Sequence, residues 1–435
     1  MSRLPIIVPS TVYPKWARPE HFLNLFEWNG LASRVLVSSE TEDAGSERPI
    51  YAINLNNQYR LDRTLASKKA AGNVCVYDAF DRKVWEKIER RNGVLLLDSA
   101  VEPLICRDDI AEGLLSGLEK EGIDPERVAL LNNNLRARSL FEERYLGRLD
   151  RRPKIVDVDC CFWLLSGFNR MTDRNRDALT FRAEAVERSR SALRERKFVS
   201  FNGRLRPHRF FVVLWLLARG CLEDGLLSFL AYESKSRPGD LTGLKRALEK
   251  TGYPEFEDVK SSFDELIRRL PISIDISLEE SQGSAAYKRT LPWRSQSGAL
   301  YDDAYFSIVV DTEFHNSECL FLTPIAFKSF MNFSPFIYFG NHGALRRMRE
   351  LGFKTFAPTI DESYDDIADF RLRMKGAFQE IRRLCSMSQM ELSELYQNLW
   401  PVLEHNYWNF YRDAPARAAG AFNRDLLGKM GFELP

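Results

Sequence analysis

The stretch from Phe201 to Phe211, FNGRLRPHRFF, places three arginines and a histidine directly before an apolar helix. The residues before it predict a short buried strand, Gly203 permits a tight turn, and Pro207 suits the first turn of a helix. Amides at a helix N-terminus attract anions, and forked guanidinium groups match phosphate geometry. We therefore expect a phosphate clamp made of Asn202, Arg204, Arg206, His208 and Arg209. The alternative is a set of surface arginines that pair with carboxylates elsewhere in the chain.

A second polar cluster lies between Tyr305 and Ile367. Its order is a strand with an acidic residue at its end, a polar turn, a helix carrying Lys328, another strand, a glycine-bearing turn and a further helix. A carboxylate near a strand end, such as Glu313, can hold ribose hydroxyls, and a lysine on the next helix can face a phosphate. This order is typical of a nucleotide-sugar site. No GxxxxGK[ST] sequence is present, so an ATPase-type phosphate loop is not supported.

The same cluster resembles the C-terminal half of GT-B-type glycosyltransferases, especially a group of bacterial and viral glycosyltransferase-like proteins. A fainter similarity, which includes FNGRLRPHR, extends to the α-1,3-fucosyltransferases. The resemblance covers roughly residues 195–370. It implies two Rossmann-like domains, a nucleotide-sugar donor held by the second one, and transfer without a bound metal. The matching residues are Glu313, Thr323, Phe327, Lys328, Pro335–Ile337, Gly340, Gly352–Phe356 and Ile360–Asp365.

One position departs from the pattern of these families. Where they place Glu-Lys after the threonine, this chain has Pro324 and Ile325. The customary ribose-binding carboxylate and phosphate-facing lysine are therefore missing from the motif. Three explanations stay open: Lys328 and the arginine turn, Arg204–Arg209, compensate; the donor nucleotide differs; or the protein is an inactive relative.

The base that activates the acceptor is expected in the N-terminal domain. In GVLLLDSAVEPL, Asp98 ends a predicted strand and Glu102 follows on the loop, where an α/β sheet exposes catalytic groups. Asp98 can instead cap the next helix.

Two further groups of candidates follow strands in the C-terminal half. Asn341 and His342, at a glycine turn, can bond a phosphate or sugar, although His342 can also be an ordinary loop histidine. Asp361 and Glu362, in IDESYDD, can bind sugar hydroxyls or the nucleotide, or they can be favourable acids at a helix N-terminus.

Alternating strand and helix patterns predict an α/β fold with mostly parallel sheets. Strands are expected over 34–39, 49–55, 73–80, 93–100 and 127–134, then 197–203, 305–314 and 334–341. We expect an N-terminal acceptor-side domain over 1–165, a helical connector over 166–196, and a nucleotide-sugar-binding domain over 197–370. Residues 371–435 are expected to form a helical segment that packs across the domains.

Composition excludes several classes of protein. The 62 Lys and Arg balance 61 Asp and Glu, which argues against a nucleic-acid-binding protein. Seven cysteines without CxxC spacing suggest reduced thiols in the cytoplasm, and no histidine spacing suggests a metal site. The longest apolar run has nine residues, too few for a membrane span, which needs about 20. Peripheral membrane association and any oligomeric state stay open.

The leading hypothesis is a metal-independent glycosyltransferase without a permanently bound cofactor. It would move a sugar from a nucleotide-activated donor to a glycan, lipid-linked glycan or protein, with the arginine turn facing a cleft between the domains. The alternative is a catalytically inactive relative that binds glycans or acts in assembly. A third possibility is another phosphate-handling enzyme, such as a sulfotransferase or a nucleotide hydrolase. The sequence does not specify the donor base, sugar, acceptor or stereochemistry.

Overall fold

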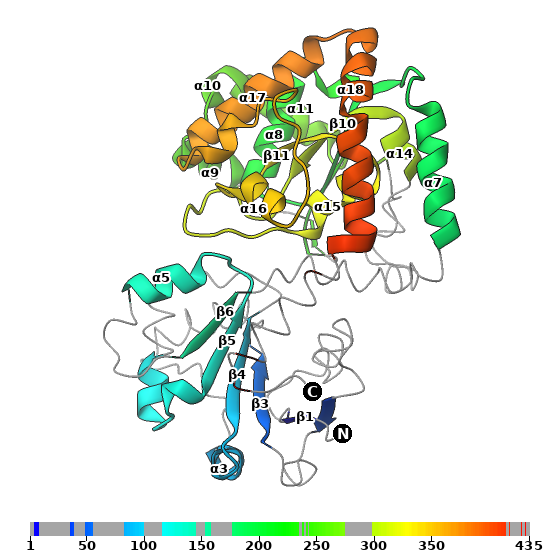
Figure 1. Cartoon of the computed structure of the whole chain (residues 1–435). Coiled ribbons are helices and arrows are strands. Elements are labelled where there is room, and N and C mark those ends of the chain that lie inside the picture. The colour runs from blue at the N-terminus through cyan, green and yellow to red at the C-terminus, as the bar shows by residue number, and fades with distance from the viewer. Residues whose placement is uncertain are drawn as a thin grey trace. The chain divides into compact units, whose positions relative to one another are not determined.

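A computed structural model of the 435-residue chain shows two compact units, each with its own sheet (Figure 1). It describes residues 4–7, 35–38, 48–54, 82–99, 115–144, 153–157, 176–234, 237–238, 241, 243–274, 298–414, 417, 428 and 431. Unit 1 comprises Met1–Phe168, Glu318–Phe321 and Pro415–Pro435, and unit 2 comprises Asn169–Ser317 and Leu322–Ala414. Both are α/β units with mostly parallel strands, so the fold is Rossmann-like α/β.

Unit 1 is built on a parallel sheet with the strand order β2-β1-β3-β4-β5-β6. The apolar runs of β4 and β5 are buried, as expected for parallel strands covered on both faces. Four predicted strands are confirmed as β2 to β5, whereas the one predicted over 73–80 lies outside the described residues. The elements are β1 (Leu4–Ile7), β2 (Val35–Ser38), β3 (Ile50–Asn54), α3 (Arg82–Arg90), β4 (Val94–Ser99), η3 (Pro125–Arg127), β5 (Val128–Asn132), α5 (Ala137–Arg144) and β6 (Lys154–Asp157).

Unit 2 is built on a sheet with the order β11-β10-β7-β8-β9, in which only the short β9 is antiparallel to its neighbour among the described strands. The central strand is β7, flanked by β10 on one side and β8 on the other. The strands are β7 (Arg196–Arg204), β8 (Gly225–Ser234), β9 (Arg237–Pro238), β10 (Ala304–Val310) and β11 (Phe336–Phe339).

Helices connect and cover these strands. No helix in the described ranges combines the length and apolar character that a bilayer span requires. The α-helices are α7 (Arg176–Ser189), α8 (Pro207–Ala218), α9 (Leu244–Thr251), α10 (Phe256–Val259), α11 (Phe263–Arg269), α14 (Gly298–Asp302), α15 (Pro324–Met331), α16 (Ala344–Glu350), α17 (Phe370–Ser386) and α18 (Gln389–Trp408). Short turns are η5 (Leu222–Asp224), η6 (Lys260–Ser262), η7 (Ser363–Asp366) and η8 (Asn409–Asp413).

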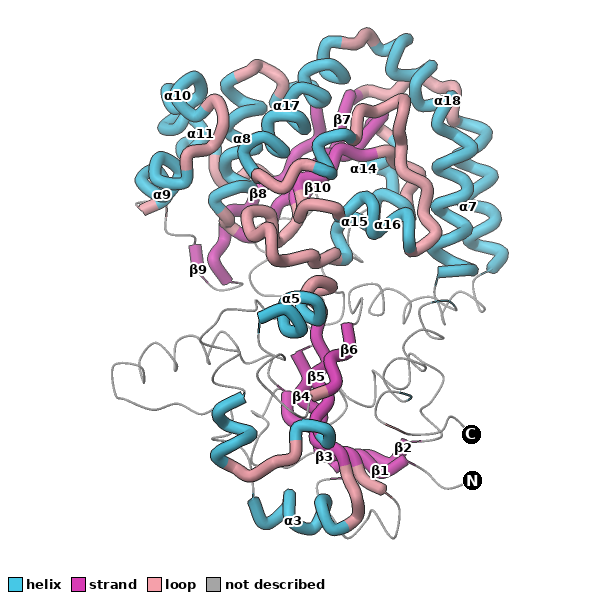
Figure 2. The backbone as a smooth tube through the Cα atoms, turned by 60° about the vertical axis from the view of Figure 1, so that its left-hand side comes forward, coloured by secondary structure: helices cyan, strands magenta, loops and turns pink. Residues whose placement is uncertain are grey.

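The helices of unit 2 lie on both faces of its sheet. The crossovers β7–α8–β8 and β10–α15–β11 run in opposite directions across the sheet, so right-handed connections place α8 and α15 on opposite faces. On the α8 face, Trp215 stacks on Phe378 of α17 with ring centroids 4.3 Å apart. On the other face, α18 packs beside α15 and α7, and the Tyr407 hydroxyl donates to the Leu179 carbonyl at 3.0 Å (Figure 2). Helices therefore cover both faces of the sheet, and loops follow the carboxyl ends of its strands.

Two predicted strand ends were wrong. Gly203 does not open a tight turn, because β7 continues to Arg204 with a register irregularity after Asn202. The strand predicted over 305–314 ends at Val310, because the next residue, Asp311, turns its carboxylate inward to bond the chain further along. As a result, Arg204 belongs to the end of β7, and Asp311 to Phe314 belong to the loop after β10.

Candidate functional site

The candidate site lies where the strand order of unit 2 reverses. The chain leaves β7 through α8 to reach β8 on one side, and β10 later pairs on the other side of β7. Ligands in open α/β sheets bind beyond the carboxyl ends of two such diverging strands. Those ends are Arg204 on β7 and Val310 on β10. The arginine turn identified in the sequence therefore lies where sheets of this class bind ligands.

The N-terminus of α8 begins at this point. Pro207 occupies the first turn, as predicted, since its fixed φ suits a helix start and it has no amide to satisfy. Arg206 is the N-cap residue with an extended backbone, and its side chain makes no capping bond. No side chain of the N-cap residue therefore competes with a ligand for the first-turn amides, where the helix dipole favours an anion.

Two buried side chains join this turn to the end of β10. His208 Nε2 lies 2.9 Å from the Asp311 carbonyl oxygen, and Arg209 Nε donates to the Val310 carbonyl at 3.2 Å. Arg209 Nη2 also lies 3.4 Å from Thr312 Oγ1. His208 and Arg209 are 3% and 4% exposed, so their positions are set by packing. A buried positive charge is thereby held at the reversal point.

Arg204 and Arg206 differ from the other arginines of this region. Arg204 is exposed and Arg206 half-buried, and within the described part of the chain neither guanidinium group has an ion-pair or hydrogen-bond partner. By contrast, both terminal nitrogens of Arg182 lie 2.6 Å from Asp302. Among the described residues, therefore, no carboxylate pairs with Arg204 or Arg206 as the alternative interpretation would require.

Asn202 lies two residues before Arg204 and is 1% exposed. Its Nδ2 donates to Ser200 Oγ at 3.1 Å, while its Oδ1 is buried without a hydrogen-bond partner among the described residues. Buried polar atoms are usually paired, so an unpaired acceptor two residues before Arg204 is consistent with ligand binding.

Two histidines behind the turn are affected by the positive charge. Burial lowers the pKa of His208 well below its usual range, and Arg209, His315 and Arg206 lower it further. The rings of His208 and His315 lie 5.3 Å apart. Burial, and then Arg373 and Arg371, lower the pKa of His315 to about 4. Burial is the larger cause for both histidines, and the nearby arginines act in the same direction.

Asp311, which directly follows β10, was not among the predicted site residues. This fully buried carboxylate accepts the Thr312 amide at 2.5 Å, the Thr323 amide at 3.2 Å and the Tyr338 hydroxyl. Burial raises its pKa despite these bonds. Asp311 therefore joins the ends of β10, α15 and β11, and its position after a run of apolar residues was the available signal.

Pro324, where the chain departs from the family pattern, lies at the start of a helix. Thr323 is the N-cap of α15 and accepts the Ile325 amide at 3.3 Å, while Pro324 occupies the first turn. The Thr323 side chain therefore caps the N-terminus of α15. Lys328 lies on the same helix and is only 7% exposed.

Three predicted residues lie in the loops that follow β10 and β11. Glu313 is half-buried in the first loop, and His342 is half-buried in the second, beside Gly343, whose φ is +77°. Asn341 is buried and donates to the Asn316 carbonyl at 3.2 Å, which joins the two loops. These residues share the carboxyl edge with the arginine turn.

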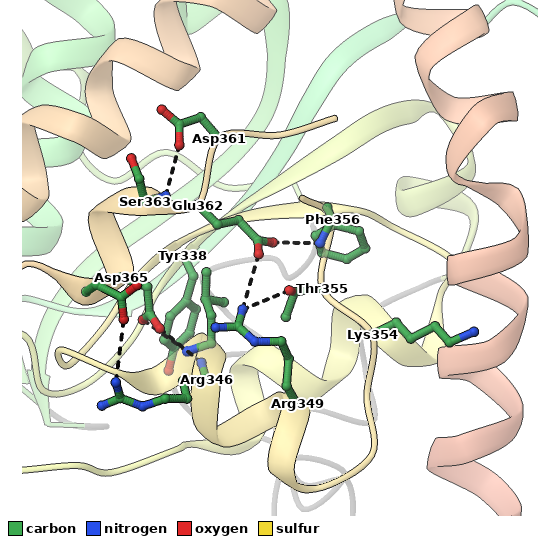
Figure 3. A network of polar contacts seen from close by, with 12 residues as sticks. Tyr338, Arg346, Arg349, Lys354, Thr355, Phe356, Asp361, Glu362, Ser363 and Asp365 are labelled. Carbon is green, nitrogen blue, oxygen red and sulfur yellow. Dashed lines mark hydrogen bonds and ion pairs between the residues drawn. The ribbon is translucent and has the colours of Figure 1, made fainter. Parts of the chain in front are cut away.

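The predicted acidic pair is used largely within the fold. Glu362 is 7% exposed, accepts the Phe356 amide at 2.6 Å and lies 3.4 Å from Arg349 Nη1 (Figure 3). Burial raises the pKa of Glu362. Asp361 is exposed and accepts the Ser363 amide at 2.9 Å. Glu362 thus holds the preceding loop in place.

Asp365, which was not a predicted site residue, caps α16. Its two carboxylate oxygens accept the amides of Leu345 and Arg346, both at 3.0 Å. The IDESYDD stretch therefore stabilises the loop and helix that follow β11.

The candidate bases belong to unit 1. Asp98 lies on β4, opposite Asn54 and Leu131, and Glu102 lies outside the described residues. After β5, the buried Asn134 donates to the Glu318 carbonyl at 3.1 Å, so this polar strand end holds a segment of the same unit.

Across the ranges that the structure describes, no group of three or more His, Cys, Asp or Glu side chains is arranged to hold a metal. No protein-family model and no curated protein matches the chain. Among solved structures, it is similar to the N-terminal domain of trehalose-6-phosphate phosphatase from Candida albicans. The identity is 10% and the TM-score 0.36, over 96% of this chain and 97% of that chain. This similarity assigns the chain to no family.

Proposed function

We propose that unit 2 binds the nucleotide-sugar donor of a GT-B-type glycosyltransferase. The observation that carries the proposal is the pair of guanidinium groups of Arg204 and Arg206, which have no partner among the described residues and lie at the reversal point of an open α/β sheet. The uncapped start of α8 and the buried Arg209 add to the positive potential there. A diphosphate matches this set better than a neutral ligand does, because each phosphate accepts forked, charge-assisted bonds.

The same groups suit the chemistry of sugar transfer. Negative charge develops on the leaving phosphate as the glycosidic bond breaks, and preorganised cations and amide dipoles stabilise it. Arg206 and the first-turn amides of α8 would contact this phosphate. The half-buried position of Arg206 strengthens the interaction, because partial exclusion of water reduces screening.

The proposal is tested by calorimetric titration with UDP, GDP, CMP, dTDP and their sugar conjugates. Loss of a charge-assisted bond costs about 1.5–3 kcal/mol, so Arg206→Ala should weaken binding of the best ligand at least about tenfold. Arg188→Ala removes the same charge from an exposed position on α7 and should leave affinity unchanged. No binding to any of these ligands, or equal effects of the two substitutions, would refute the assignment.

A binding protein without transferase activity is the second candidate. It is favoured by Pro324 and Ile325, which replace the two charged residues of the related motif with a helix start. Release of free nucleoside diphosphate from the best-binding nucleotide-sugar, with and without a glycan acceptor mixture, separates the two. Acceptor-stimulated release supports the transferase, whereas binding without release supports the inactive relative.

A further inference from the structure

The side-chain amide of Asn202 has a fixed orientation. Ser200 Oγ donates its proton to the Ile308 carbonyl oxygen at 2.8 Å, and a carbonyl has no proton to return. The amide group that lies 3.1 Å from Ser200 Oγ must therefore be the donor, Nδ2. It follows that the free end of the Asn202 amide is the carbonyl oxygen, Oδ1.

This orientation leaves a buried acceptor at the end of β7. Oδ1 is shielded from solvent and has no hydrogen-bond partner within the described part of the chain. Such an atom is destabilising when nothing donates to it, because it has lost its hydration without gaining a partner. A leucine of similar size would avoid this destabilisation. The presence of an asparagine therefore suggests that a ligand group donates a hydrogen bond to Oδ1.

The chemistry of Oδ1 restricts the ligand. A carbonyl oxygen repels the oxygens of a phosphate and accepts only from a neutral or cationic donor. Two residues further along, the arginine turn begins with Arg204, and its positive charge favours an anion. A ligand that satisfies both must carry a phosphate and, close to it, a hydrogen-bond donor. A phosphorylated sugar has this combination, whereas an inorganic anion has only the first part.

We propose that Asn202 Oδ1 accepts a hydrogen bond from a sugar hydroxyl of the ligand, next to the phosphate held by Arg204 and Arg206. Asn202 is then a specificity-determining residue that selects phosphorylated sugars over simple phosphates. The inference rests on the proposed donor site and names the part of the donor that is recognised. A site built to bond a hydroxyl discriminates strongly against an analogue without it, because the buried partner is left unpaired.

The test compares two probes, inorganic pyrophosphate and the best-binding nucleoside diphosphate sugar, by calorimetry on the full chain. Asn202→Leu should weaken the nucleotide-sugar about tenfold or more and leave pyrophosphate affinity unchanged. Arg206→Ala should weaken both probes. If Asn202→Leu weakens both probes equally, or neither, the role of Asn202 is refuted. If Arg206→Ala changes neither, the proposed phosphate site itself fails, so the two failures are distinguishable.

A second measurement separates recognition from folding. Deoxy analogues of the nucleotide-sugar, each lacking one sugar or ribose hydroxyl, are titrated against the wild type and Asn202→Leu. One analogue should bind the wild type about tenfold more weakly than the parent but bind Asn202→Leu as well as the parent does. Should Asn202→Leu fail to fold, Asn202→Ser takes its place. A structural role for Asn202 would instead give the same deoxy penalties in both proteins, which overturns the proposal.

Discussion

The neutral His315 is expected to make unit 2 sensitive to acid. Its Nε2 lies 2.6 Å from the Tyr253 hydroxyl, and its ring lies within 5.6 Å of the rings of Phe314 and Phe370. Burial and two nearby arginines lower its pKa to about 4. Protonation inside this aromatic, cationic environment is therefore unfavourable, whereas an unfolded chain protonates the same imidazole near its ordinary pKa of about 6.5.

The sign and size of the effect follow from this difference. Between pH 6.5 and about 4 the unfolded chain binds a proton that the folded chain does not bind, so stability falls as the pH falls through this range. At about 1.36 kcal/mol for each pKa unit, the full loss is roughly 3 kcal/mol. Above the unfolded pKa, His315 is neutral in both states and contributes no pH dependence.

The substitution His315→Gln tests this effect, because glutamine can still form a hydrogen bond with Tyr253 but does not titrate in this range. Urea unfolding followed by fluorescence should show that the variant loses roughly 3 kcal/mol less stability than the wild type between about pH 8 and pH 4. Tyr253→Phe is the matched control, because it removes the hydrogen bond and keeps the imidazole. Parallel pH profiles for the wild type and His315→Gln would refute the reasoning.

Three further predictions concern the loops around the site, and urea unfolding checks each. Asp365→Ala should lower stability by about 1–2 kcal/mol, because two amides of α16 lose their cap; an unchanged midpoint contradicts the cap. Arg373→Met should cost about 3 kcal/mol or more, since four carbonyls, two of them buried, lose their donor; a loss below 1 kcal/mol would argue against that role. Gly340→Ala places a Cβ 2.1 Å from the Tyr338 ring and should cost about 1–3 kcal/mol, a prediction that wild-type stability would overturn.

The strands were predictable where local pattern alone determines them. The runs VLLL and VALL are apolar, bounded by turn residues and buried as β4 and β5. β8, GLLSFLAYES, was missed because its alternation is interrupted, and its position depends on pairing with β7. The start of α8 at Pro207 was also predicted, because it depends on the residues of that short stretch alone.

The details of the site depend on contacts that the local sequence does not contain. The end of β10 is set by Asp311, whose partners are Thr323 and Tyr338, 12 and 27 residues away. Which arginines are free also depends on where distant carboxylates lie. The cluster of arginines was predictable, but only the structure distinguishes the buried Arg209 from Arg206, which has no partner among the described residues.

The most direct test is a crystal structure of the chain soaked with the nucleoside diphosphate that binds best. We predict that a phosphate lies within hydrogen-bond distance of the Arg206 guanidinium group and the first-turn amides of α8. A well-ordered nucleotide bound elsewhere, with Arg204 and Arg206 pointing away from it, would contradict this prediction.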